Sequence, residues 1–97
     1  MTNPRAIVMN CADNTATVVQ TIEPGDFVTV EVGGKSDIVQ VTEKIPFAHK
    51  FAISDIPKGN KIVKYGETIG IATQDIKNGQ HVHVHNLESG RGRGDRS

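Results

Sequence analysis

The chain has 97 residues, with 11 basic and 11 acidic side chains that give a formal net charge of zero. A chain of this length is expected to form one domain around one core, and its balanced charge gives no steering toward nucleic acid or an anionic membrane. The sequence has no long apolar run and no secretion-type leader, and Cys11 has no second cysteine to pair with. We therefore expect a cytoplasmic protein with Cys11 in its core and with no nucleic-acid or membrane partner.

The first half of the chain predicts two β-hairpins. Apolar stretches at residues 6–9 and 15–19 flank the turn-forming Ala12-Asp13-Asn14, and stretches at 27–32 and 37–41 flank Gly33-Gly34. Val, Ile and Thr are abundant and aromatic residues make up only 4%, a composition that favours strands. Helical spacing of apolar residues never lasts more than about two turns, so we expect an all-β module with little helix.

A short motif occurs three times, with an isoleucine, a glycine three residues later, and an alternating strand after it. The copies start at Ile22, Ile56 and Ile76, and their glycines are Gly25, Gly59 and Gly79. Glycine at this place supplies the positive φ of a tight turn. The copies are too few and too unevenly spaced for a solenoid, so we predict equivalent corners of one small barrel-like or clip-like sheet.

Three of the four histidines alternate with valines in His81-Val82-His83-Val84-His85, and Asn86 follows. On a strand the three imidazoles would project from one face while the valines pack on the other. Neutral imidazole is a common ligand of divalent transition metals, so this pattern predicts a metal site, with an exposed polar strand as the alternative. Same-face neighbours are about 7 Å apart, so we expect His83 and His85 to bind the ion and His81 to be the doubtful ligand.

Two lysines and the only tyrosine lie near predicted strand ends, in His49-Lys50 and in Lys64-Tyr65-Gly66. A lysine beside a carboxylate-bearing substrate can act as a charge clamp, and one that loses its solvation can act as a base. The alternatives are ordinary solvated lysines and a tyrosine that only closes a strand end.

The composition changes after Asn86, where glycines and arginines alternate. Such a segment buries too little apolar surface to offset its chain entropy, so we predict a domain at residues 1–88 and a flexible tail at 89–97. Guanidinium groups pair with carboxylate or phosphate, which makes Arg91 and Arg93 candidate substrate-binding residues. An RNA-binding tail is the alternative, but the sequence has no basic surface to support it.

The chain resembles, closely in its second half and loosely in its first, the SAF domain found at the N-terminus of altronate and galactarate dehydratases. The resemblance lies in the His49-Lys50 pair, the Lys64-Tyr65-Gly66 block, the glycine turns, and Val82-His83-Val84-His85-Asn86, in this order. It implies a β-clip fold and a hydro-lyase that removes water from a hexonate or hexarate to give a 2-keto-3-deoxy acid. It also implies a divalent metal, Fe2+ or Mn2+.

The resemblance assigns roles to residues of this chain. The implied metal ligands are His83 and His85, with His81 as the doubtful member. The implied catalytic residues are His49, Lys50 and Lys64, and the implied substrate-binding residues are Tyr65, Asn86, Arg91 and Arg93. A chain this small cannot enclose a six-carbon substrate alone, so we expect a small subunit that is inactive until a large dehydratase subunit binds it, with the arginine tail docking on that partner.

Other functions and assemblies stay open at this point. A rival within the same family is the small subunit of (2R)-sulfolactate sulfo-lyase, which expels sulfite in place of water. A rival of another class is a non-catalytic SAF binding or chaperone module, which has no need of the histidines. Exposed strand edges also leave a homo-oligomer open.

Overall fold

The computed structural model describes residues 3–32 and 34–89, and within these ranges every regular element is a strand. The strands are β1 (Arg5–Ile7), β2 (Thr15–Val18), β3 (Phe27–Val32), β4 (Lys35–Gln40), β5 (Lys50–Ala52), β6 (Lys61–Lys64), β7 (Glu67–Ala72), β8 (His81–Val82) and β9 (Leu87–Ser89). The all-β class predicted from composition is confirmed. No helix in these ranges is long and apolar enough to cross a membrane.

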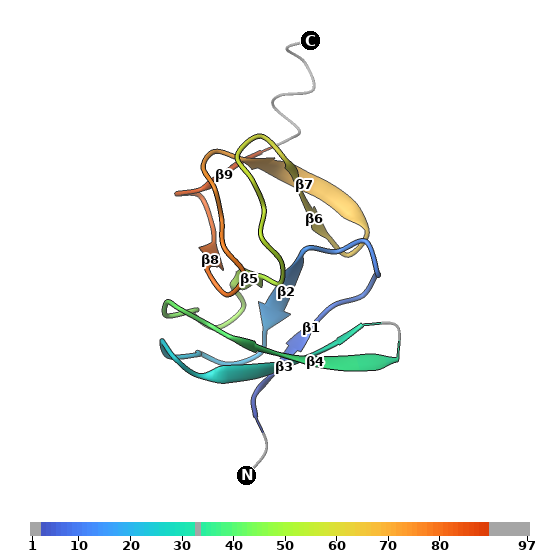
Figure 1. Ribbon diagram of the computed structural model, residues 1–97, viewed down its shortest axis with the longest axis vertical. Helices are drawn as coiled ribbons and strands as arrows, with labels where there is room; N and C mark the ends of the chain where they lie inside the picture. The colour runs from blue at the N-terminus through green and yellow to red at the C-terminus, as the bar shows by residue number, and fades with distance from the viewer. Residues whose placement is uncertain (1–2, 33, 90–97) are drawn as a thin grey trace.

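The strands form two sheets, one of six strands in the order β4-β3-β1-β2-β5-β8 and one of three in the order β6-β7-β9 (Figure 1). The pairs β1–β2 and β3–β4 are antiparallel, which confirms both predicted hairpins. Strand β9 pairs with β7, and its last residue, Ser89, is the first residue of the predicted tail. The remainder of that tail lies outside the described residues.

Two apolar clusters fill the interior. One cluster joins the six-stranded sheet through β1 to β5 and includes Val28, Val30 and Phe51. The other lies between β5, β8 and the smaller sheet, and includes Ala52, Ile62 and Val82. Successive residues of a strand point to opposite faces, so Phe51 enters the first cluster while Ala52 enters the second. Strand β5, which begins at Lys50, therefore lies between the two cores.

The predicted corners exist, and the structure contains a fourth that the sequence analysis missed. In each corner a backbone N–H donates a hydrogen bond of 2.9 to 3.0 Å to the carbonyl three residues earlier. The residue before the donor has a φ between +70° and +94°. This is the geometry of a type II turn. Three corners have glycine at that position, and the fourth, Pro46-Phe47-Ala48-His49, has Ala48.

The four corners associate in two pairs through their isoleucines. Ile22 and Ile45 exchange backbone hydrogen bonds at 2.9 Å, and Ile56 and Ile76 do so at 2.7 and 2.8 Å. All four side chains are buried. The corners thus fix the direction in which the following segments leave, and two of those segments, which start at His49 and Gln80, carry the histidines.

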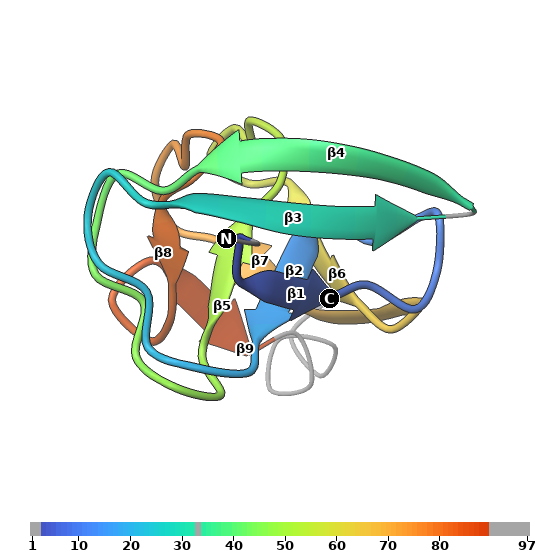
Figure 2. The same ribbon diagram turned by 90° about the horizontal axis from the view of Figure 1, so that it is seen from below.

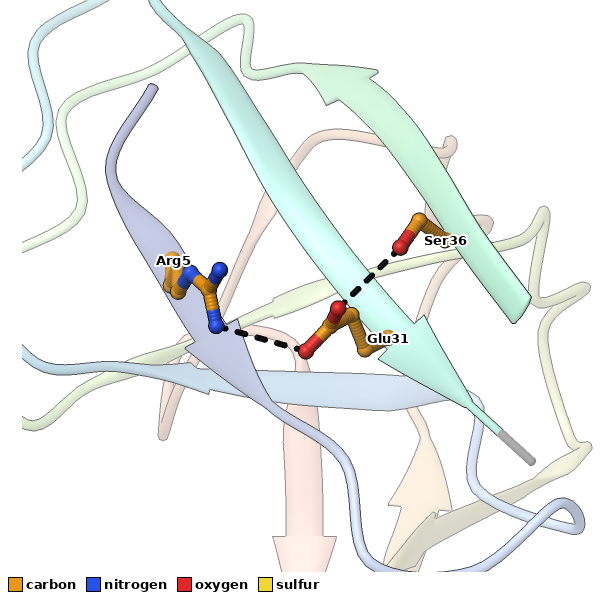
Figure 3. Close-up of polar contacts among 3 residues, drawn as sticks. All are labelled: Arg5, Glu31 and Ser36. Atoms are coloured by element: carbon orange, nitrogen blue, oxygen red, sulfur yellow. Dashed lines mark hydrogen bonds and ion pairs between the residues drawn. The ribbon is translucent and has the colours of Figure 1, made fainter. Parts of the chain in front are cut away.

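The outer face of the β1–β3–β4 region is solvent-exposed and polar in part (Figure 3). Glu31 accepts hydrogen bonds from Arg5 at 3.4 Å and from Ser36 at 3.2 Å. Both members of the ion pair are more than half exposed, and such pairs contribute about 0 to 1 kcal/mol. This face therefore offers substitutions that serve as controls for the site described below.

Candidate metal centre

The segment that holds three of the histidines is not the long strand that the sequence predicted. Strand β8 contains only His81 and Val82, and residues 83–86 form a turn in which the Asn86 N–H donates to the His83 carbonyl at 3.0 Å. Val82 is fully buried as expected, but Val84 is 79% exposed, so the prediction that both valines pack inward is wrong. The alternation of valine and histidine continues through His85, although the strand ends at Val82. The pattern therefore predicted a longer strand than the structure contains.

The imidazole rings nevertheless converge, and a fourth ring joins them. The ring of His81 lies 5.5 Å from that of His83 and 5.3 Å from that of His85, measured between centroids. His49, at the start of β5, stacks on His83 at 4.3 Å and on His81 at 5.1 Å. The β5–β8 pairing explains this arrangement, because it places Phe51 opposite His81. His81, the ligand that sequence analysis doubted, lies at the centre of the histidine cluster, defined as these four rings.

Two sets of donor atoms within the cluster are close enough to share one ion. His49, His81 and His83 form an all-imidazole set, and Glu43, His81 and His85 form a mixed set; within each set the donor atoms lie within 4.8 Å of one another. Inside the first set, His49 Nδ1 and His81 Nε2 are 2.9 Å apart and share a hydrogen bond. The donors are of the types that bind divalent transition metals, so the residues present fit such an ion.

Glu43 was missed by the sequence analysis. Its Oε1 accepts a hydrogen bond from the backbone N–H of His81 at 3.0 Å, although the two residues are 38 positions apart. The segment after β4 reaches β8 because Thr42 N–H donates to the Gly79 carbonyl at 3.0 Å, and Figure 2 shows β8 on the side at which β4 ends. A Cβ at Gly79 would lie 2.4 Å from the Gln40 carbonyl oxygen, so this approach requires glycine.

Burial and the neighbouring imidazoles favour the neutral form of the central ring, His81. Burial, followed by the neighbouring His49, His85 and His83, lowers the pKa of His81 from 6.5 to about 4, with Glu43 acting in the opposite direction. The pKa of His83 is also lowered, by loss of solvation first and then by His49, Lys50 and His85. Neutral imidazole is the form that ligates metals, so both rings are ready to bind an ion at neutral pH without losing a proton.

The two predicted lysines lie close enough to influence each other. Burial, with a smaller contribution from Lys64, lowers the pKa of Lys50. Lys50 also contributes to the lowered pKa of His83, so its charge acts on the histidine cluster. In β2, Thr17 lies directly opposite Lys50, and its buried hydroxyl has no hydrogen-bond partner in the described parts of the chain.

The Lys64-Tyr65-Gly66 block forms the tip of the β6–β7 hairpin. Tyr65 and Gly66 have φ values of +54° and +80°, the pattern of a two-residue type I′ turn. Buried Asp13 holds this tip, since its Oδ1 accepts the Gly66 N–H at 2.7 Å. The Lys64 ammonium lies 5.2 Å from the centre of the Tyr65 ring. Tyrosine seldom adopts a positive φ, and residues held in this way are frequent at functional sites.

The remaining predicted residues have mixed outcomes. Asn86 is 2% exposed; its Oδ1 accepts the His83 N–H at 3.0 Å and its Nδ2 donates to the His81 carbonyl at 2.9 Å. It therefore holds the turn that orients the rings, and its substrate-binding role stays a prediction. Arg91 and Arg93 lie outside the described residues. Cys11 is exposed, so its predicted place in the core is wrong, because the β1–β2 connection that contains it runs over the surface.

Comparison with known proteins agrees with this architecture. The model of the altronate/galactarate dehydratase SAF domain matches residues 4–90. The chain belongs to this SAF domain family. The match extends through both halves of the chain, including the first half, where the resemblance in sequence was looser, and thus includes all four corners and Glu43.

The curated relatives of this SAF domain are lyases by name. The (2R)-sulfolactate sulfo-lyase subunit alpha of Chromohalobacter salexigens is 38% identical over 76 residues, which cover 76% of this chain and 81% of that protein. The altronate dehydratase of Escherichia coli is 38% identical over 83 residues, which cover 86% of this chain but only 16% of that protein. The galactarate dehydratase (L-threo-forming) of the same species is 41% identical over 46 residues, 47% of this chain and 9% of that protein. The SAF domain therefore occurs both as most of a subunit and as a small part of a long chain.

Proposed function

We propose that this chain is the small SAF subunit of a sugar-acid dehydratase and supplies ion-binding and substrate-binding side chains to a larger catalytic subunit. The observation that carries the proposal is the convergence of the four histidines, with Lys50 directly after His49 in the chain. Membership of the altronate/galactarate dehydratase SAF family supports the choice of reaction.

The chemistry of the reaction suits these side chains. Dehydration removes the proton beside the substrate carboxylate, expels hydroxide from the neighbouring carbon and leaves an enol that becomes the 2-keto-3-deoxy acid. A divalent ion, Fe2+ or Mn2+, would supply a Lewis acid that stabilises the negative charge of this reaction. Because the pKa of Lys50 is lowered, a larger fraction of its amine is neutral at a given pH and able to accept the proton. The Lys64 ammonium would then pair with the substrate carboxylate.

A larger partner is part of the proposal, since the described residues form two small cores and a surface site. Two exposed apolar side chains lie close in sequence to the ring-bearing residues: Phe47, 65% exposed, precedes His49 by two positions, and Val84, 79% exposed, lies between His83 and His85. Apolar side chains around polar groups are typical of an interaction surface. Covering them with a catalytic subunit would exclude water from the cluster.

Reconstitution with the large lyase subunit tests this function. We expect formation of 2-keto-3-deoxy acid from altronate or galactarate only when both chains are present. His81→Ala is expected to reduce turnover at least about 100-fold, because it removes the central ring. Arg5→Ala, which removes only the exposed ion pair with Glu31, is the matched control and should leave turnover unchanged. Equal turnover in the His81→Ala complex would instead favour a non-catalytic SAF binding or chaperone role.

Sulfolactate sulfo-lyase is the second candidate function, and the size of the relatives favours it. The sulfo-lyase subunit alpha is matched over 81% of its length, whereas the altronate dehydratase is matched over 16%. The same ion site and lysines suit a substrate with a carboxylate and a sulfonate. Release of sulfite from (2R)-sulfolactate by the reconstituted complex, without dehydration of either sugar acid, would assign the chain to this second reaction.

A further inference from the structure

Glu43 changes the kind of ion site that the histidine cluster offers. The mixed set has one carboxylate and two imidazoles, whereas the other set has three imidazoles. Two histidines and one carboxylate on one side of an ion, with further positions open, are typical of non-haem Fe2+ sites. A carboxylate also offsets part of the charge of a divalent cation, which three neutral rings do not do.

The hydrogen bond between His49 and His81 favours the mixed set over the three-imidazole set as the ion site. It joins His49 Nδ1 to His81 Nε2 at 2.9 Å, so an ion that used both atoms would have to displace this bond. A ligating histidine normally gives one ring nitrogen to the metal while the other bonds to a partner that fixes the ring. His49 can serve as that partner for His81 and leave the second nitrogen of His81 for an ion.

Glu43 is held in position before any ion arrives. Its Oε1 accepts the backbone N–H of His81 at 3.0 Å, and the backbone around it is tied to the Gly79 corner by the Thr42–Gly79 bond at 3.0 Å. His85 lies within the turn of residues 83–86, which Asn86 holds through its bond with the His83 N–H. All three donors of the mixed set thus come from segments that are fixed by hydrogen bonds.

The geometry points to Glu43, His81 and His85 as the ligands of the divalent ion, with His49 as the residue that orients His81 and with His83 outside the coordination sphere. This inference rests on the proposed function for the presence of an ion. It adds to that function a carboxylate ligand and the identity of the two imidazole ligands.

Mn2+ binding to the full chain tests the assignment without any enzyme assay. Free Mn2+ is followed by electron paramagnetic resonance at pH 7 in wild type and in two matched variants, His83→Phe and His85→Phe, each of which removes ring nitrogens but keeps a flat ring. We expect His85→Phe to weaken binding at least about 100-fold, because loss of even an outer partner costs about 10- to 100-fold and loss of a ligand costs more. His83→Phe should change binding less than about 3-fold, because His83 neither ligates the ion nor bonds to a ligating ring in the proposed site. Glu43→Gln, which keeps an oxygen for the His81 N–H, is expected to match His85→Phe.

The opposite pattern would overturn the inference while leaving the proposed function in place. Strong loss in His83→Phe with unchanged binding in Glu43→Gln would assign the ion to the three-imidazole set. Unchanged Mn2+ binding in all of these variants and in His81→Ala would show that the ion binds outside the histidine cluster, and the proposed function would fail with it. Circular dichroism of each variant, compared with wild type, separates loss of a ligand from loss of the fold.

Discussion

The segment after β4 lies close to the Gly79 corner that precedes β8, and two glycine substitutions test whether this contact is needed. The two glycines share a backbone conformation but differ in their surroundings. Gly59 and Gly79 have φ values of +91° and +94°. A Cβ at Gly59 would meet nothing within 4 Å, whereas a Cβ at Gly79 would lie 2.4 Å from the Gln40 carbonyl oxygen. Alanine at Gly59 therefore adds only backbone strain, and alanine at Gly79 adds the same strain plus a steric overlap with backbone.

The magnitudes follow from these two contributions. A left-handed conformation costs an L-residue about 1 to 2 kcal/mol, so Gly59→Ala should lower the free energy of unfolding by about that amount. An overpacked site costs about 1 to 3 kcal/mol more, so Gly79→Ala should cost about 2 to 5 kcal/mol. In a domain of about 100 residues each 1 kcal/mol changes the melting temperature by about 4 to 8 °C.

Urea unfolding monitored by circular dichroism measures both variants, and Mn2+ binding provides a second readout. Gly79→Ala should displace the segment that carries Glu43 and weaken Mn2+ binding, while Gly59→Ala should leave Mn2+ binding unchanged. Equal destabilisation of the two variants, or equal Mn2+ affinity, would refute the role assigned to the close approach at Gly79.

Three further predictions concern the remaining parts of the site. Ala48→Gly should raise the free energy of unfolding by about 0.5 kcal/mol, because relief of the strain at φ +70° exceeds the added entropy of the unfolded chain; a loss of stability in urea unfolding would contradict this. Asn86→Ala should lower stability by about 1 to 3 kcal/mol, because it leaves the His83 N–H and the His81 carbonyl unpaired; unchanged hydrogen exchange at the His83 amide would argue against it. With its pKa lowered to about 4, His81 binds fewer protons in the folded than in the unfolded chain between about pH 4 and 6.5, so stability should increase with pH across this window and be lost as the pH falls through it. An NMR titration of metal-free protein that places the His81 pKa near 6.5 would disprove this environment.

The corners show which parts of the fold a sequence pattern can predict. Isoleucine followed three residues later by glycine marks a local turn whose geometry depends on the residues themselves, so three corners were found. The fourth has Ala48 in the same conformation, and no residue type signals it because the tertiary structure imposes the strain. A strand pattern also failed at residues 83–86, where the Asn86 side chain bonds to the His83 N–H and ends the strand despite the continuing alternation.

The residues of the candidate site could also be predicted only in part from the sequence. His83 and His85 stand out because they repeat within one short segment, and the resemblance to SAF domains singled out His49, Lys50 and Lys64. The central position of His81 follows from the register between β5 and β8, which the sequence does not reveal. Glu43 comes from a part of the chain 38 residues away, and only the folded backbone brings it to the cluster.

The central claim is that the imidazoles gathered around His81 form a binding site for a divalent ion. Calorimetric titration of the purified chain with Mn2+ at pH 7 tests it most directly, with His81→Ala and Arg5→Ala measured in parallel. The account predicts saturable binding in wild type and Arg5→Ala and none in His81→Ala. Binding that is the same in all three proteins, or absent from wild type, would contradict it.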